Sequence, residues 1–135
     1  MQDYKIVKFE VALKVTNEDI EDIFSAAFCD GIAYWAGLKE AEGFACPEEM
    51  AMSEFISKGN KAILYDIEDK SEEWILNSDV VIAGIERYIS EGNKPYNIIC
   101  EDTVDNALAI DTGMVDSAVA DMIIQYGLFS KLIYG

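Results

Sequence analysis

Carboxylates are the only side chains in this sequence that we consider as candidates for catalysis. The chain has 26 Asp and Glu residues, 10 Lys and Arg residues and no histidine. Without histidine, nucleophiles of the Ser–His and Cys–His kinds cannot be built. The motifs SxxK, GxSxG, GxGxxG and GxxxxGKS/T are missing as well, so we expect neither their nucleophilic nor their phosphate-binding chemistry.

Two pairs of carboxylates precede or begin the last predicted helix: Asp102 with Asp105, and Asp111 with Asp116. Such oxygen ligands can bind Mg²⁺ or Ca²⁺, and a carboxylate pair can serve glycoside hydrolysis. However, residues 102–116 do not match a calcium-binding EF-hand loop, and chance pairs are expected in so acidic a chain. We therefore interpret these acids as helix caps and solvated side chains. No catalytic residue, metal ligand or cofactor is predicted.

Aromatic side chains gather in two segments far apart in the sequence. Tyr34 and Trp35 follow the predicted end of the first helix, and Tyr126 and Tyr134 lie near the end of the chain. A tryptophan in this setting anchors a core or lines a pocket or an interface. Tyr34, Trp35, Tyr126 and Tyr134 are accordingly our candidate residues for binding a ligand or a partner.

The charge balance predicts a polyanionic surface around an apolar core. The formal net charge is −16, yet 51% of the residues are hydrophobic. The composition is too apolar for disorder, and carboxylates are rarely buried unpaired. Such a surface repels nucleic acids and anionic lipids, so we expect neither direct nucleic-acid binding nor membrane binding. It favours a basic protein partner; the alternative is that the acids serve solubility alone.

Three widely spaced cysteines, Cys29, Cys46 and Cys100, form no CxxC motif. Their odd number and spacing argue against a disulfide framework and against a zinc site. They are typical of small apolar residues in a reducing compartment. Neither a signal peptide nor a long apolar span is visible, so the predicted location is the cytoplasm.

Hydrophobic periodicity and turn residues predict the elements that must position these side chains. The expected strands cover residues 4–15, 61–67, 73–76 and 96–100, with a further short candidate at 132–134. Residues 32–36 are expected to form either a strand or a helical turn. The first expected helix runs from Thr16 to a stop at Asp30-Gly31, where the glycine is expected to be left-handed. The second runs from Pro47 to Lys58-Gly59, and the third from a cap at Asn77 or Ser78 to about residue 91. The last covers residues 114–129. Residues 37–46 and 101–113 are expected to be loops.

This order of elements predicts an α+β fold. Because two strands adjoin as a hairpin, the chain is not a regular alternation of strands and helices. We expect a small, mostly antiparallel sheet with three to four helices packed against it. The length fits one domain over residues 1–135.

Three segments carry a family resemblance. Residues 19–36 read DIEDIFSAAFCDGIAYWA, with an aromatic I-x-Y-W end; residues 63–76 resemble an "ILYDxE…WEL" hairpin; residues 116–135 resemble an "ADxIIQYALFGxIVYG" ending. Together they resemble a family of small uncharacterised proteins of prophages and mobile elements in Firmicutes and other gut bacteria. The family implies no activity, cofactor or catalytic residue. Asp30-Gly31 departs from it, and so does Gly127, which stands where alanine is expected and costs a helix up to about 1 kcal/mol.

The resemblance and the charge together predict a non-enzymatic phage or mobile-element protein. It would bind a basic host or phage protein, as a nucleic-acid mimic or inhibitor. A small-molecule-binding module with an aromatic pocket is the alternative, and a carboxylate metal-dependent hydrolase is the second alternative. The sequence does not predict the oligomeric state.

Overall fold

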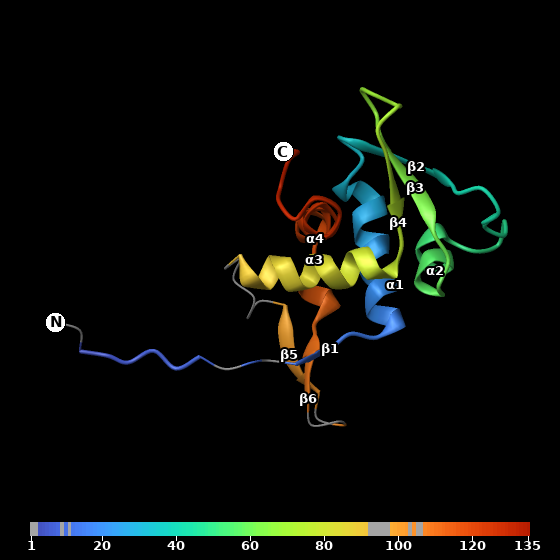
Figure 1. Cartoon of the computed structure of the whole chain (residues 1–135). Coiled ribbons are helices and arrows are strands. Elements are labelled where there is room, and N and C mark those ends of the chain that lie inside the picture. Colours follow the sequence, from blue (N-terminus) through green and yellow to red (C-terminus); the bar gives the residue numbers. More distant parts are fainter. Residues whose placement is uncertain (1–2, 9, 11, 92–97, 103, 105–106) are drawn as a thin grey trace.

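A computed structural model describes residues 3–8, 10, 12–91, 98–102, 104 and 107–135. Within these residues it has four α-helices and two three-stranded sheets, so the predicted α+β fold is confirmed (Figure 1). The strands form two separate small sheets rather than the single sheet expected. In chain order the elements are β1 (Leu13–Lys14), α1 (Asn17–Ala26), the π turn η1 (Ala27–Gly31), β2 (Ala36–Glu40), α2 (Met52–Ser57), β3 (Ala62–Asp66), β4 (Glu73–Leu76), α3 (Ser78–Ser90), β5 (Ile99–Asp102), β6 (Ala107–Ile110), the 3₁₀ turn η3 (Thr112–Met114) and α4 (Ser117–Phe129).

One sheet is antiparallel, in the order β2-β3-β4, and contains the predicted hairpin. Leu64 at its centre lies between Leu38 of β2 and Trp74 of β4. Strand β2 occupies part of the segment 37–46 that was expected to be a loop, so that prediction is wrong. A glycine fits the strand here, because a Cβ at position 37 would lie 2.2 Å from the ring of Tyr65 on the neighbouring strand.

The other sheet has the order β1-β6-β5, with β6 antiparallel to β5 and parallel to β1. Of the predicted strand 4–15, Leu13–Lys14 form β1, whereas residues 4–8, 10, 12 and 15 have no regular structure, so the prediction is wrong there; residues 9 and 11 lie outside the described residues. The predicted loop 101–113 is also wrong, because it contains the end of β5 and all of β6. Residues 99–100 of the predicted strand 96–100 form the start of β5, and residues 96–97 lie outside the described residues.

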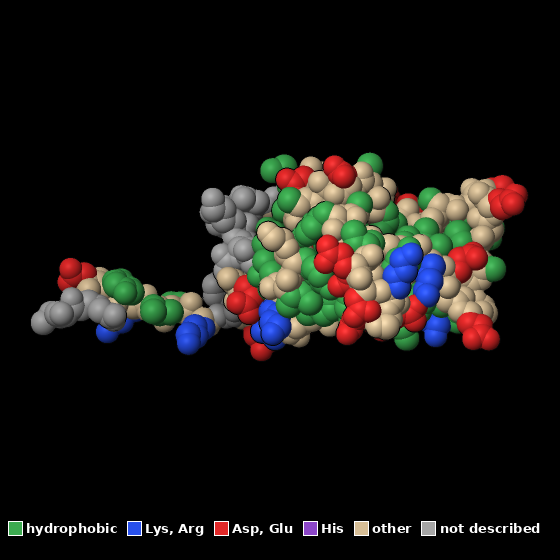
Figure 2. All heavy atoms as spheres, turned by 90° about the horizontal axis from the view of Figure 1, so that it is seen from above, with side chains coloured by type: hydrophobic (Ala, Val, Ile, Leu, Met, Phe, Trp, Pro, Cys, Tyr) green, Lys and Arg blue, Asp and Glu red, His purple; other side chains and the backbone are tan. Residues whose placement is uncertain are grey.

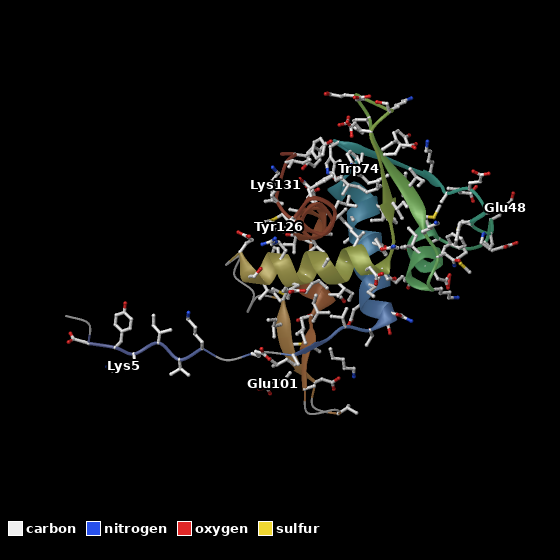
Figure 3. The ribbon with its side chains drawn as sticks, in the orientation of Figure 1. Lys5, Glu48, Trp74, Glu101, Tyr126 and Lys131 are labelled. Carbon is white, nitrogen blue, oxygen red and sulfur yellow. The ribbon has the colours of Figure 1, made fainter. Side chains whose placement is uncertain are left out.

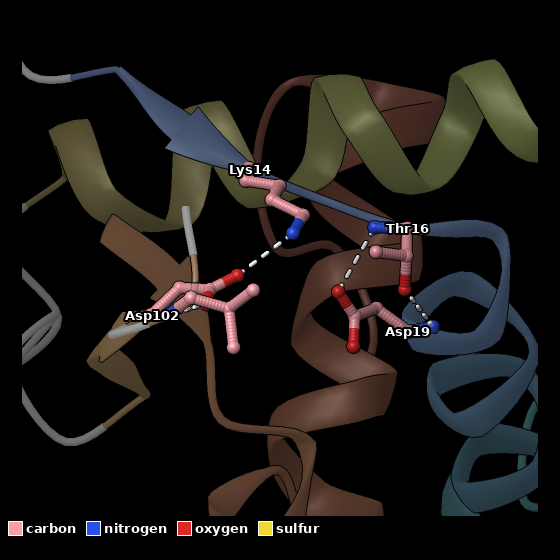
Figure 4. A network of polar contacts seen from close by, with 5 residues as sticks. Lys14, Thr16, Asp19 and Asp102 are labelled. Atoms are coloured by element: carbon pink, nitrogen blue, oxygen red, sulfur yellow. Dashed lines mark hydrogen bonds and ion pairs between the residues drawn. The ribbon is translucent and has the colours of Figure 1, made fainter. Parts of the chain in front are cut away.

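Local capping signals set the start of α1 and join it to this sheet (Figure 4). The Thr16 hydroxyl accepts a hydrogen bond from the Asp19 N–H, and the Asp19 carboxylate accepts one from the Thr16 N–H, the predicted capping box. Two residues earlier, Lys14 of β1 forms a 2.7 Å ion pair with Asp102 of β5. The entry to α1 is therefore fixed both locally and across the sheet.

The predicted stop of the first helical segment at Asp30-Gly31 is confirmed, but the left-handed glycine predicted there and the predicted start of the next helix are wrong. Gly31 ends the π turn after α1 but does not take the left-handed conformation. Its role is close approach, because a Cβ there would lie 2.6 Å from the carbonyl oxygen of Ser117. The helix predicted from Pro47 begins only at Met52, since Pro47 opens a separate turn and Ala51 is extended. It ends as predicted before Gly59, which has φ of 99°.

Helices α3 and α4 cross at unusually short range through two glycines. A Cβ on Gly84 would lie 2.0 Å from the carbonyl oxygen of Ile123, and one on Gly127 would lie 2.0 Å from that of Val80. No larger residue fits either position without moving a backbone. The packing of α4 against α3 thus explains why glycine stands at position 127 despite its low helix propensity.

Helix α4 is the centre of the core, being apolar on nearly every side as expected for a buried helix. Asp116 caps the N-terminus of α4, as Asn77 caps that of α3. Helix α4 starts at Ser117 rather than at the predicted residue 114. The chain then reverses at Ser130, which has a left-handed backbone with φ of 61°. Residues 131–135 form no strand, contrary to the candidate at 132–134, and instead fold back along α4.

Candidate functional site

The turn that follows η1 places Tyr34 and Trp35 in environments that differ in solvent exposure. The amide of Trp35 donates to the carbonyl of Ile32, which closes a tight turn just before β2. Trp35 is buried, whereas Tyr34 is 52% exposed, with its hydroxyl in a partly buried hydrogen bond. Both side chains nevertheless reach one acceptor on α4.

That acceptor is Asp121, a carboxylate only 8% exposed. Its Oδ1 accepts hydrogen bonds from Trp35 Nε1 at 2.8 Å and from Gln125 Nε2 at 2.9 Å. Its Oδ2 accepts a bond of 2.6 Å from the hydroxyl of Tyr34. These three hydrogen bonds offset the free-energy cost of burying the carboxylate. That cost is large for a buried carboxylate without partners.

Gln125 lies one helical turn after Asp121 and connects it to the end of the chain. It is 1% exposed, and its Oε1 accepts hydrogen bonds from the backbone N–H groups of Ile133 and Tyr134, both at 2.9 Å. The pair Asp121–Gln125 therefore ties the turn at Tyr34-Trp35 to the returning tail, residues 131–135.

Aromatic packing completes the attachment of the tail. The ring of Tyr134 stacks on Trp35 with centroids 4.4 Å apart and planes 10° apart. Trp35 also makes edge contacts with Trp74 and Phe129, each at 6.0 Å between centroids. The hydroxyl of Tyr134 donates a 2.7 Å hydrogen bond to Asp66 Oδ2, so the tail is joined to the end of β3.

A small pocket of about 180 Å³ opens beside this cluster. It is lined by Tyr34, Trp35, Asp66, Ile67, Glu68, Tyr134 and Gly135. Its walls thus combine tyrosine rings with two carboxylates from the beginning of the β3–β4 turn. Pockets for drug-sized ligands usually measure about 300–1,000 Å³, so this one suits a single side chain or a small ion.

The hydrogen bonds and charges around the pocket favour the neutral phenols of Tyr34 and Tyr134 and the ionised form of Asp66. Burial, followed by the hydrogen bond to Asp121, raises the pKa of Tyr34 to about 12. Burial, followed by the bond to Asp66, likewise raises the pKa of Tyr134 to about 12. The hydrogen bond from Tyr134 in turn lowers the pKa of Asp66. At neutral pH the pocket is therefore anionic and walled by uncharged tyrosine rings.

The structure brings together three of the four residues predicted from the sequence. Tyr34, Trp35 and Tyr134 lie around the pocket, but Tyr126 does not. Tyr126 lies on the side of α4 that faces α3, where its ring contacts Tyr88 edge-on at 6.5 Å (Figure 3). Tyr126 therefore does not line this pocket, because the chain reverses at Ser130, between Tyr126 and Tyr134.

Sequence reasoning missed the polar residues that build the site: Asp66, Asp121 and Gln125. A signal was present for two of them. Asp121 and Gln125 are four residues apart on an otherwise apolar helix, a spacing that places both side chains on one face. Polar residues in that position require buried partners, and the nearby Tyr and Trp donors supply them.

The carboxylates considered for metal chemistry have structural partners instead. Asp111 accepts from the N–H of Gly113 within η3, and Asp116 accepts from the N–H of Val119 as the cap of α4. Asp102 holds Lys14 and accepts from the N–H of Val104. Asp105 lies outside the described residues. Within the described residues no group of three or more Cys, Asp or Glu side chains is placed to hold a metal ion.

Acidic side chains are dispersed over the face shown in Figure 2, where they alternate with apolar and neutral surface. They do not merge into one continuous patch on that face. As far as the chain is described, no helix has both the length and the apolar character needed to cross a membrane. The three cysteines form no disulfide.

Comparison of the chain with protein-family models, with curated proteins and with solved structures finds no match. The resemblance to a prophage protein family therefore stays a prediction.

Proposed function

We propose that this protein is a non-enzymatic binding protein whose anionic pocket receives a cationic side chain of a basic protein partner. The observation that carries the proposal is the combination of Asp66 and Glu68 with the tyrosines in one small pocket. Among the described residues neither carboxylate forms an ion pair with a Lys or Arg of this chain. The site is thus charged and aromatic, and no Lys or Arg within the described part of the chain is ion-paired to its carboxylates.

The surroundings of the pocket strengthen its attraction for a cation. The turn between β3 and β4 carries Asp69 and Glu72 in addition to the pocket carboxylates, against one lysine, Lys70. Both acids lie close enough to raise the pKa of Tyr134 through their charge. A guanidinium or ammonium group gains from ionised carboxylates and from neutral aromatic faces alike.

The size of the pocket favours a protein side chain over a metabolite. A volume of about 180 Å³ is below the usual range for small-molecule sites, so the small-molecule alternative is less well supported. The dispersed acids in Figure 2 also favour a local contact over mimicry of an extended phosphate backbone. A basic host or phage protein remains the partner that the family resemblance suggests.

The proposal is tested by calorimetric titration with short neutral peptides that each carry an arginine, and with the same peptides carrying citrulline. Glu68→Gln is expected to weaken arginine-peptide binding about twofold to fivefold, the range of one exposed ion pair. Glu101→Gln is the matched control, because Glu101 is an exposed acid of β5 far from Trp74 in Figure 3. Binding should also weaken as salt is added.

Two results would show that the proposal is wrong. One is equal affinity for the arginine and citrulline peptides, which would remove the role of the positive charge. The other is an equal loss in Glu68→Gln and Glu101→Gln, which would attribute binding to net charge and not to the pocket.

A further inference from the structure

An arm at the start of the chain, residues 3–8, extends away from the body of the protein (Figure 1). Within the arm, the adjacent residues Ile6 and Val7 are 71% and 80% exposed. Leaving two large aliphatic side chains in water is unfavourable compared with burying them. An arm of this kind is typical of a segment that becomes buried against a partner.

A groove of about 550 Å³ lies between β1 and α3 and has the matching chemistry. Its apolar walls are Leu13 and Val15 on one side and Ile82, Ile85 and Ile89 on the other. The three isoleucines lie at i, i+3 and i+7, so they form one stripe of α3. Ile82 is 43% exposed, whereas Ile85 is 4% exposed, so the stripe is open to a further apolar segment at Ile82.

The arm cannot readily fill the groove of its own chain. Leu13 and Val15, which follow the arm, already line one wall, so the arm would have to reverse direction immediately before them. Residues 3–15 contain neither glycine nor proline, the residues best suited to a tight reversal. An arm from a second copy meets no such constraint.

Charge and length also fit a second copy. The arm has Lys5 and Lys8 against one acid, Asp3, in a chain whose net charge is −16. The groove carries Glu86 beside its apolar walls, so a basic apolar arm is complementary to it. Six extended residues span about 20 Å, whereas the isoleucine stripe spans about 10 Å of helix.

We propose that this protein forms a dimer by reciprocal exchange of its N-terminal arms. The arm of each copy lies in the groove between β1 and α3 of the other, with Ile6 or Val7 against the isoleucine stripe. Strand β1 is an edge strand of its sheet, so the arm can also pair with it through the backbone. This inference does not depend on the function of the pocket.

The test is the mass of the full chain in solution, measured by light scattering and sedimentation at several concentrations. The wild type is expected to be a dimer, and Ile6→Glu/Val7→Glu is expected to weaken dimerisation at least about tenfold. Ile82→Glu in the groove should have the same effect. Ile75→Glu is the control, because Ile75 is an exposed aliphatic residue of β4 in the other sheet.

A photo-crosslinking residue at position 6 identifies where the arm lies. In a mixture of heavy-isotope and light-isotope chains, crosslinks to residues 82–90 should join chains of different mass. A monomeric wild type, a dimer that survives both the arm and the groove variants, or crosslinks within single chains only would each overturn the proposal.

Discussion

Trp35 Nε1 donates a hydrogen bond of 2.8 Å to Asp121 Oδ1, and the two residues are 86 positions apart in the sequence. The bond joins the turn before β2 to the middle of α4. Because Gln125 extends it to the tail, a single buried carboxylate orders the aromatic wall of the pocket. The stability of this region and the shape of the pocket are therefore coupled through Asp121.

Replacing Asp121 by alanine is expected to destabilise the protein by about 3 kcal/mol. Three donors lose their acceptor, and Trp35 is only 2% exposed; each such loss costs about 1–3 kcal/mol. Urea unfolding followed by tryptophan fluorescence measures the change. A loss below about 0.5 kcal/mol would mean that the network contributes little.

Gln125→Met is expected to release the tail while keeping the shape of the side chain. The amides of Ile133 and Tyr134 lose their common acceptor, so local opening should become at least about tenfold more frequent. Trypsin cleavage after the exposed Lys131 reports that opening. Cleavage after Lys70, in the β3–β4 turn, is the internal control and should keep its wild-type rate; equal acceleration at both sites would indicate general unfolding instead.

Gly127→Ala is expected to destabilise the protein, although alanine is the better helix former. The gain in helix propensity is about 1 kcal/mol, but the added methyl group overlaps the Val80 carbonyl oxygen, and overpacking costs about 1–3 kcal/mol. The free energy of unfolding in urea should fall, while Ser25→Ala on the exposed face of α1 should change it by about 0.5 kcal/mol or less. A more stable Gly127→Ala variant would contradict the close crossing of α3 and α4.

Stability is expected to fall at high pH through Tyr34 and Tyr134. Their pKa of about 12 in the folded protein exceeds the ordinary value of 10.0, so the fold favours the protonated phenols. This contribution is complete below pH 10 and is lost as the pH rises toward 12. Unfolding free energies across that window should decline less in Tyr34→Phe/Tyr134→Phe; an unchanged slope would show that these phenols titrate normally.

The parts of the fold predicted correctly are those governed by local signals. The β3–β4 hairpin, the Asn77 cap of α3 and the capping box at Thr16 depend on neighbours in the sequence. The strands that were missed depend on distant partners: β2 is a strand because β3 pairs with it, and β6 because β1 and β5 flank it. Charge and glycine content alone indicated loops there.

The same distinction between local signals and distant contacts explains which residues of the candidate site could be predicted. The types of Tyr34, Trp35 and Tyr134 made them candidates for binding, but their common location follows from the chain reversal at Ser130 and from the buried Asp121–Gln125 pair. Gly31 and Gly127 were misinterpreted for a related reason. Both are needed where two backbones approach closely, which no local pattern reveals.

The most direct test of the pocket is a titration of the isotope-labelled protein with an arginine peptide, followed by two-dimensional amide and indole N–H spectra. The predicted result is a concentration-dependent shift of the Trp35 indole and of the Glu68 and Tyr134 amides, with the Glu101 amide unchanged. The citrulline peptide should leave all four resonances in place. Binding of the arginine peptide that shifts Glu101 but leaves Trp35, Glu68 and Tyr134 unmoved would contradict the assignment of the pocket as the site for a cationic side chain.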